Sequence, residues 1–298
     1  MIKTLDELLS HVKGNEPKNI VVAAAEDQNV LEAIKTAMTE EIVNPILIGD
    51  KKKIEQIASE INFDLDLTEL IHEKDPIVAS QKAVKIIHEN KAEILMKGLV
   101  GTSDLLKSVL HKEHGIRKRE LLSHVSIFES PYYHKLLGVS DVAMNIAPEL
   151  KEKIAIIENA VEVMQSIKVE IPKVAIIAAV ELVNPAMPPT MDAAILSVMN
   201  KRGQIKNCII DGPLALDNAV SAYSAKVKNI KSEVAGDADL LIVNDIEAGN
   251  HLYKSLSFLG GATVAAIVMG AKVPVVLTSR ADSERSKLMS IALACCIK

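Results

Sequence analysis

Tryptophan is absent from this sequence of 298 residues, and only three phenylalanines and four tyrosines are present. Few aromatic side chains are therefore available to stack on nucleic-acid bases. An excess of positive charge is also missing, because 34 basic residues face 39 acidic ones and the formal net charge is −5. Nucleic-acid binding needs a basic surface. We therefore expect no nucleic-acid partner.

Cysteine is scarce as well, with only Cys208, Cys295 and Cys296 in the chain. These cysteines show no CxxC spacing and the eight histidines no HExxH pattern, so we expect no metal site. An odd number of cysteines without a disulfide framework fits a reducing cytoplasm. The first residues carry charges before any apolar run begins, which is unlike a signal peptide. The longest uncharged apolar segment, 260–271, is too short to cross a membrane, so we expect no membrane partner.

Apolar residues make up 49% of the chain, which supplies a core for two α/β lobes or one large lobe. Short apolar runs rich in β-branched residues alternate with amphipathic helical stretches. Several runs are apolar throughout, as in parallel strands that are covered on both faces. The alternation predicts a doubly wound α/β fold. The expected strands are 19–24, 45–49, 93–96, 124–128, 142–146, 173–178, 207–210, 240–243 and 273–277, and expected helices include 30–38, 52–59, 77–90 and 105–110.

A polar segment, Thr278-Ser279-Arg280, follows the last expected strand, and a helical pattern follows it. Ser279 and Asp282 fit a capping box with Ser279 as the N-cap, which is the purely structural explanation. The alternative is an anion site. Free N–H groups at a helix N-terminus favour negative charge, and the fork of the Arg280 guanidinium fits phosphate. Asp282 is the nearest carboxylate and a candidate base, although a capping role would compete for the same side chain.

Three more segments place glycines or polar residues near the ends of expected strands, where ligands bind in open α/β sheets. Each also has a structural explanation, because such residues commonly form turns and caps. In the first segment, 96–104, Thr102 or Ser103 could cap the next helix. In the second, 258–263, paired glycines precede the apolar segment 264–269, which we expect to be helical. The third is the polar segment 243–254. The candidate substrate-binding residues are Lys97, Thr102, Lys107, Asp245, Asn250, Gly260 and Gly261.

Other catalytic signatures are missing. The glycine-containing turns match neither a Walker A loop nor G-x-G-x-x-G. Without a G-x-S-x-G elbow, a serine acyl-enzyme of the hydrolase type is not indicated. His134, beside two tyrosines, is a possible proton carrier, but a surface loop would explain it equally.

Four segments together resemble the phosphate acetyl/butyryltransferase family, most closely its butyryltransferase branch. They are Asp211-Gly212-Pro213-Leu214-Ala215-Leu216-Asp217, the run from Val234 to Val243, Asn244-Asp245-Ile246-Glu247-Ala248-Gly249-Asn250, and Thr278-Ser279-Arg280. The likeness also includes Lys97-Gly98 and residues 23–27, so it covers nearly the whole chain.

The resemblance implies two α/β domains that flank a cleft, as in isocitrate and isopropylmalate dehydrogenases, with the C-terminal segment completing the first domain. Residues 1–147 and 273–298 would form that domain and residues 148–272 the second. It also implies a homo-oligomer. Acyl-CoA or CoA and phosphate would be the substrates, with no cofactor. Ser279 and Arg280 would contact phosphate and substrate, and Lys107 matches an arginine of the acetyltransferase branch.

The sequence departs from that branch at one position. The aspartate proposed there as the base, seven residues after the serine, is Ser286 here. The departure favours exchange of a butyryl or branched short-chain acyl group between coenzyme A and phosphate. Phosphate acetyltransferase activity and a non-catalytic acyl-CoA-sensing domain are the alternatives. A nicotinamide-dependent dehydrogenase would need paired metal-binding aspartates and an arginine cluster, which the sequence lacks.

Overall fold

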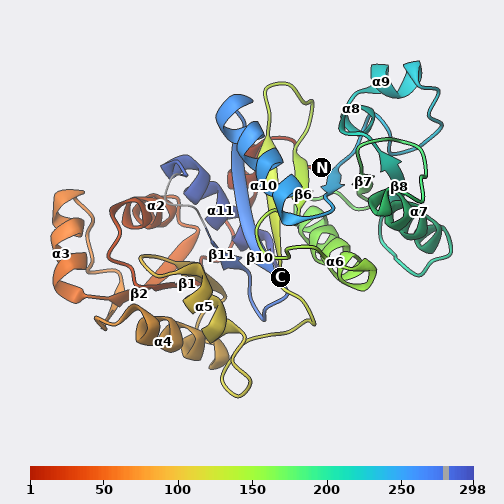
Figure 1. Ribbon diagram of the computed structural model, residues 1–298. Coiled ribbons are helices and arrows are strands. Elements are labelled where there is room, and N and C mark those ends of the chain that lie inside the picture. The colour runs from red at the N-terminus through yellow and green to blue at the C-terminus, as the bar shows by residue number, and fades with distance from the viewer. Residues whose placement is uncertain (278–281) are drawn as a thin grey trace. The chain divides into compact units, whose positions relative to one another are not determined.

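The computed structural model describes residues 1–277 and 282–298. The chain divides into two compact units (Figure 1). The first unit comprises Met1–Leu5 and Leu121–Val264, and the second comprises Asp6–Glu120 and Ala265–Lys298. The domain boundaries predicted from the sequence, after residues 147 and 272, differ from the limits of these units and stay a prediction.

The second unit is a doubly wound α/β sheet. Its strand order is β3-β2-β1-β4-β11-β10, parallel except for β10 against β11. The strand order reverses at β1, so the helices after β1 and after β3 cover opposite faces; α2 and α11 lie on one side of β1 and β2, and α4 and α5 on the other (Figure 1). The elements are α1 (Leu5–Val12), β1 (Lys18–Ala23), α2 (Gln28–Thr39), β2 (Val43–Gly49), α3 (Lys51–Glu60), β3 (Glu69–His72), α4 (Pro76–His88), β4 (Ile94–Lys97), α5 (Thr102–Val109), β10 (Thr263–Met269), β11 (Val275–Val276) and α11 (Glu284–Cys296).

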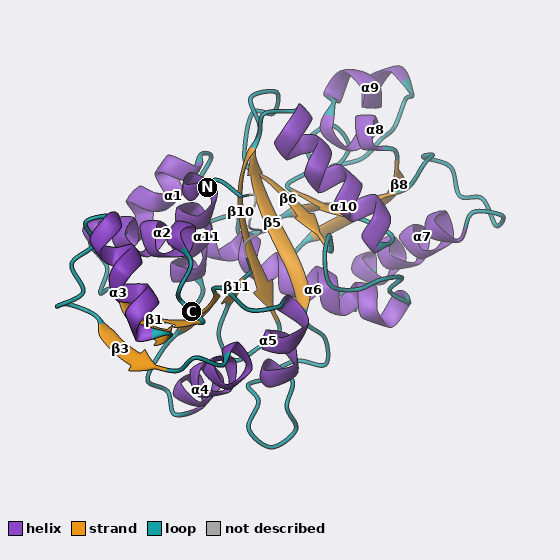
Figure 2. Cartoon of the chain, turned by 60° about the vertical axis from the view of Figure 1, so that its left-hand side comes forward, coloured by secondary structure: helices purple, strands orange, loops and turns teal. Residues whose placement is uncertain are grey.

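The first unit has the strand order β5-β6-β9-β7-β8, with β5 antiparallel to β6 and the rest parallel. Figure 2 shows its strands in orange among the purple helices. Its elements are β5 (Ser123–Glu129), β6 (Leu137–Ser140), α6 (Leu150–Ser166), β7 (Lys173–Ile177), α7 (Pro188–Lys201), β8 (Ile209–Leu214), α8 (Leu216–Val220), α9 (Ala222–Val227), β9 (Leu240–Ile242), α10 (Ile246–Lys254) and the π-helix η1 (Ser255–Leu259).

Aspartates at the strand-to-helix turns start several helices of the second unit. Asp27, Asp50 and Asp75 are the N-caps of α2, α3 and α4, and each side chain accepts a hydrogen bond from a backbone N–H of the first turn. Such a cap satisfies N–H groups that have no partner within the helix. The helices therefore begin immediately beyond the carboxyl ends of the strands, which fixes where the connecting loops lie.

Three local predictions are wrong. Residues 264–269 form strand β10 instead of a helix, and all six are buried. Residues 142–146 are not a strand; β6 ends at Ser140, and the Asp141 carboxylate accepts hydrogen bonds from the next turn. The helix expected to begin after Ser279 instead begins at Glu284 with Ser283 as its N-cap, and Ser279 itself lies outside the described residues.

No helix among the described residues combines the length and apolar character that crossing a membrane requires.

Candidate functional site

Three parallel strands of the second unit end together beside the segment that carries the strongest sequence prediction. Met96 of β4 is in register with Val22 of β1 on one side and Val276 of β11 on the other. The chain that leaves β11 therefore starts at the carboxyl edge of this sheet, where ligands bind in open α/β folds. Ser279 and Arg280, two of the three predicted catalytic residues, follow in the sequence and lie outside the described residues.

The turn after β4 places a lysine at this carboxyl edge. The Lys97 ammonium donates to the carbonyl oxygens of Gly98 at 3.1 Å and Val100 at 3.3 Å. Gly98 passes so close to β1 that a Cβ atom there would lie 2.0 Å from the carbonyl oxygen of Ala24. Only glycine fits that approach. The turn therefore requires Gly98, and the Lys97 ammonium lies against the turn, bonded to its carbonyl oxygens.

Thr102 and Lys107 belong to α5. Thr102 is the first residue of the helix, and the N-cap is Gly101, so the predicted cap by Thr102 or Ser103 is wrong. Lys107 is 77% exposed, and its ammonium lies 3.0 Å from the Asp104 carboxylate. Lys107 lines a surface pocket of about 710 Å³ between α4 and α5.

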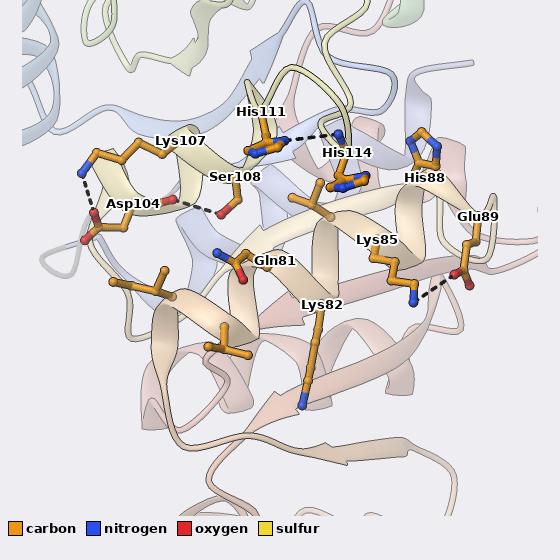
Figure 3. Close-up of a pocket in the computed structure, with 13 residues that line it drawn as sticks. Gln81, Lys82, Lys85, His88, Glu89, Asp104, Lys107, Ser108, His111 and His114 are labelled. Atoms are coloured by element: carbon orange, nitrogen blue, oxygen red, sulfur yellow. Dashed lines mark hydrogen bonds and ion pairs between the residues drawn. The ribbon is translucent and has the colours of Figure 1, made fainter.

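The lysines of this pocket all have acidic neighbours (Figure 3). Lys85 pairs with Glu89 and Lys107 with Asp104 within the view, and Lys82 pairs with Glu73 at 2.7 Å. Such exposed pairs contribute little to stability. A neighbouring carboxylate therefore offsets the charge of each of these three lysines.

The start of α11 carries Ser286, the position at which the sequence departs from the pattern of the acetyltransferase branch. Ser286, at that position, is 7% exposed. Its backbone N–H and its hydroxyl both lie 3.1 Å from the Ser283 hydroxyl, which caps the helix. The Glu284 carboxylate accepts a hydrogen bond from Thr36 of α2 at 3.1 Å. Ser286 and Glu284 thus hold the helix start. Asp282, the third predicted catalytic residue, directly precedes the N-cap Ser283 in the chain.

At the carboxyl edge of the first unit, Asp245 has the structural role that the sequence left open. It is the N-cap of α10, and its carboxylate accepts from the Ala248 N–H at 2.8 Å. The neighbouring Asn244 amide donates to the Ile177 carbonyl at 2.9 Å and so links the ends of β9 and β7. Asn250 lies within α10. A substrate role for Asp245 or Asn250 stays a prediction.

Gly260 and Gly261 connect η1 to a strand, not to a helix as the sequence suggested. Gly261 has a φ of +64°, a left-handed conformation that favours glycine. The N–H of Gly260 closes η1 by donating to the Ser255 carbonyl at 2.8 Å. Because β10 follows, the helix N-terminus expected to hold a phosphate here does not exist.

The opposite, amino edge of the first unit holds a cluster of charges that the sequence did not single out as such. The Lys135 ammonium, 7% exposed, lies 2.6 Å from Asp239 and 2.8 Å from Asp237. Lys173 pairs with Asp237 at 2.6 Å, and its backbone N–H donates to Asp239 at 2.8 Å. The four residues precede or open β6, β7 and β9, and their ion pairs hold the starts of these strands together.

Burial and the charges of this cluster shift the pKa values of Asp237 and Tyr133. Burial pushes the pKa of Asp237 upward, but hydrogen bonds from Lys135 and Lys173 outweigh it and hold the pKa well below its usual range. Burial, followed by the charges of Asp237 and Asp239, raises the pKa of Tyr133, whose hydroxyl donates to the Ala238 carbonyl at 2.7 Å. His134, the possible proton carrier, pairs with Asp237 at 3.0 Å, so it belongs to the amino edge and away from the ligand edge of its own sheet.

Comparisons with known proteins agree with these features. The family described as "Phosphate acetyl/butaryl transferase" matches residues 3–77 and 74–295. The phosphate butyryltransferase of Clostridium acetobutylicum is 48% identical over 294 residues, which are 99% of this chain and 98% of that protein. The phosphate acetyltransferase of Thermotoga maritima is 46% identical over 290 residues, 97% and 98% of the two chains.

Solved structures give the same answer for the fold. A branched-chain phosphotransacylase from Enterococcus faecalis has a TM-score of 0.81 at 34% identity and covers 93% of this chain and 97% of its own. A 4-hydroxythreonine-4-phosphate dehydrogenase from Klebsiella pneumoniae has a TM-score of 0.54 at 13% identity, a likeness of fold alone that fits the predicted dehydrogenase-like architecture. The family match and the two relatives cover nearly the whole chain, which therefore belongs to the phosphate acetyl/butyryl transferase family.

Proposed function

We propose that the protein exchanges a short-chain acyl group, butyryl or branched, between coenzyme A and inorganic phosphate, giving acyl phosphate and CoA. The observation that carries this proposal is the 48% identity to a phosphate butyryltransferase over 98% of that enzyme. The branched-chain phosphotransacylase supports a branched substrate through its likeness in structure and sequence.

In this reaction a phosphate oxygen attacks the thioester carbonyl, the C–O bond forms, and the C–S bond breaks to release CoA as a thiolate. The tetrahedral intermediate carries an oxyanion, which N–H donors or cations stabilise. Arg280 is the residue proposed to bind phosphate, with Ser279 beside it, and Lys97 provides a second cation at the same edge of the sheet. We propose that no metal or cofactor takes part.

The reverse direction needs a proton acceptor, because the thiol of CoA has a pKa above neutrality. Ser286 occupies the position of the aspartate that the acetyltransferase branch is proposed to use, and its hydroxyl is tied to Ser283. We therefore propose Asp282 as the base. Its position in the chain supports this, because it lies between Arg280 and the first turn of α11.

A panel of acyl-CoA substrates tests the function. Acetyl-, butyryl- and isobutyryl-CoA are each incubated with phosphate, and free thiol is followed with and without excess EDTA. We expect kcat/KM for butyryl- or isobutyryl-CoA to exceed that for acetyl-CoA by about tenfold or more, because each methylene in an apolar pocket is worth ~1–3 kcal/mol. EDTA should have no effect.

Each alternative gives a different result in this panel. Fastest turnover of acetyl-CoA would make the protein a phosphate acetyltransferase, an alternative favoured by the 46% identity to the Thermotoga maritima enzyme. Binding of acyl-CoA in calorimetry without turnover of any substrate would indicate an acyl-CoA-sensing domain. Activity lost to EDTA and restored only by a divalent ion would contradict metal independence.

We also propose that the chain works as a homo-oligomer in the cytoplasm. The resemblance to the family supports the oligomer. The three cysteines, all free thiols in the structure, support a reducing compartment.

A further inference from the structure

Lys287, on the first turn of α11, is only 2% exposed. Its ammonium donates a hydrogen bond to the carbonyl oxygen of Asp282 at 2.5 Å. Across residues 1–277 and 282–298, this carbonyl is the one hydrogen-bond partner recorded for the ammonium, and no carboxylate forms an ion pair with it. A charged group that is buried without an opposite charge is costly.

The other buried lysines differ in this respect. Lys135 is paired with Asp237 and Asp239. Lys153, 4% exposed, pairs with Asp192 at 2.6 Å. In both cases a carboxylate offsets the buried charge, as is usual for buried ions. The Lys287 ammonium instead donates a hydrogen bond to a single backbone carbonyl, that of Asp282.

That carbonyl lies at a defined place in the chain. Asp282 is two residues beyond Arg280 in the sequence and precedes the cap of α11. Helical side chains point back toward the N-terminus of their helix, and so the Lys287 side chain reaches a carbonyl five residues earlier. Its bond is not part of the helix's own hydrogen-bond ladder, and it fastens the incoming chain to the helix.

The first turn of α11 is itself fixed to the second unit. Glu284 accepts a hydrogen bond from Thr36 of α2, and Arg285 lies 3.0 Å from Asp6 of α1. Ser283 caps the helix through the N–H of Ser286. A chain fastened to this turn by Lys287 is therefore linked through it to α1 and α2 of the same unit.

We propose that Lys287 is a positioning residue for the acyl-transfer reaction. By holding the Asp282 carbonyl, its buried ammonium fixes the point at which the segment with Ser279 and Arg280 joins α11. The inference rests on the proposed function, in which these two residues bind phosphate. Lys287 acts through Asp282 and does not contact the substrate.

The central test is Lys287→Met in the full-length protein, which keeps the length of the side chain and removes the ammonium. Losing a hydrogen bond from a charged donor should lower kcat/KM for phosphate by about 10- to 100-fold, with a smaller change in KM for the acyl-CoA. The melting temperature should stay the same or rise, because an uncompensated buried charge is removed. Lys287→Arg, which keeps a cationic donor, should recover part of the loss.

Two further variants calibrate the result. Arg280→Ala sets the scale for direct loss of phosphate binding. Ser290→Ala is the matched control, because Ser290 is one turn further along α11, is also 2% exposed, and accepts a hydrogen bond from the Ala266 N–H at 2.9 Å. It should lower the melting temperature and leave kcat/KM per folded molecule unchanged.

Amide hydrogen exchange separates this inference from the proposed function. Lys287→Met, but not Ser290→Ala, should speed exchange at residues 282–286, whether or not the wild type transfers acyl groups. A wild type without acyl transfer would thus contradict the proposed function alone. Unchanged phosphate kinetics and exchange in Lys287→Met would overturn the positioning role. So would an equal loss in all kinetic constants together with a fall in melting temperature.

Discussion

Lys135 in the first unit and Lys287 in the second are both almost fully buried, at 7% and 2% exposure, but their partners differ. Lys135 lies between two carboxylates at the amino edge of its sheet. Lys287 holds one carbonyl, that of Asp282, which is two residues after Arg280 in the sequence. Burial of a charge therefore has two uses here. At the amino edge, compensated charges hold strands together, and at the start of α11 a single cation holds the carbonyl of Asp282.

The comparison also shows what the sequence motif from residue 234 to 243 contains. That run carried much of the resemblance to the family, yet its acidic residues Asp237 and Asp239 pair with lysines at the amino edge. Ligands in open α/β sheets bind at the opposite, carboxyl edge. The motif thus identifies the fold of the first unit more directly than its chemistry.

The largest effect on stability should follow from Lys135→Met. The change leaves the Asp239 carboxylate, 4% exposed, without its ion pair, which should lower the free energy of unfolding by about 3–5 kcal/mol. Because the chain has no tryptophan, urea unfolding is best followed by far-UV circular dichroism. Acyl transfer per folded molecule should be unchanged, the reverse of the result expected for Lys287→Met.

Lys173→Met is the control for this prediction. Lys173 is 33% exposed and its partner Asp237 is 41% exposed, so solvent screens the pair and the loss should stay below about 1 kcal/mol. If both variants lose the same free energy of unfolding, burial of the Lys135 ion pairs does not strengthen them. The contrast between carboxylate-paired Lys135 and carbonyl-bonded Lys287 would then have no energetic basis.

A buried histidine should make the first unit sensitive to acid. Burial lowers the pKa of His124 to about 4, and its ring nitrogen lies 3.2 Å from the Ser126 hydroxyl. The unfolded chain binds a proton near pH 6.5 and the folded chain does not, so stability falls as the pH drops from 6.5 toward 4. Between pH 7 and pH 5 the loss from this residue should be about 2 kcal/mol.

The measurement is urea unfolding at the two pH values in the wild type and in His124→Gln. The variant should lose most of the pH dependence, whereas His114→Gln, a change at an exposed histidine, should keep it. If His124→Gln loses as much free energy of unfolding between pH 7 and pH 5 as the wild type does, groups other than His124 cause the acid sensitivity.

The strands of the parallel sheets could be predicted because their runs are apolar throughout and do not alternate with polar residues. The strand expected at 19–24 became β1 at Lys18–Ala23, and the one at 240–243 became β9 at Leu240–Ile242. The run 264–269 was assigned to a helix because six apolar residues fit either structure. Pairing between strands decides the choice, and one such contact joins Val268 of β10 to Val275 of β11 across a turn.

The site was predictable to a lesser degree. The turn at Lys97 was found from its glycines, and the structure places it at the carboxyl edge of its sheet. Lys135 and Lys287 were missed, because a lysine has no pattern of its own in a sequence. Their roles depend on Asp239, which is distant in the chain, and on a backbone carbonyl. Neither the burial nor the backbone partner can be read from residue types.

The smallest effect concerns the cap of α11, where sequence and structure disagree. The sequence favoured Ser279 as the N-cap, but the helix begins at Glu284 and the Ser283 hydroxyl accepts the N–H of Ser286 at 3.1 Å. Loss of a serine cap costs about 1 kcal/mol, which in a chain of this size lowers the melting temperature by about 2 °C. Ser283→Ala should show this loss in thermal unfolding and Ser279→Ala should not. The opposite order would place the cap at Ser279 and lengthen α11 toward Arg280. The Asp282 carbonyl would then belong to the helix's own hydrogen-bond ladder, and Lys287 would have no incoming chain to hold.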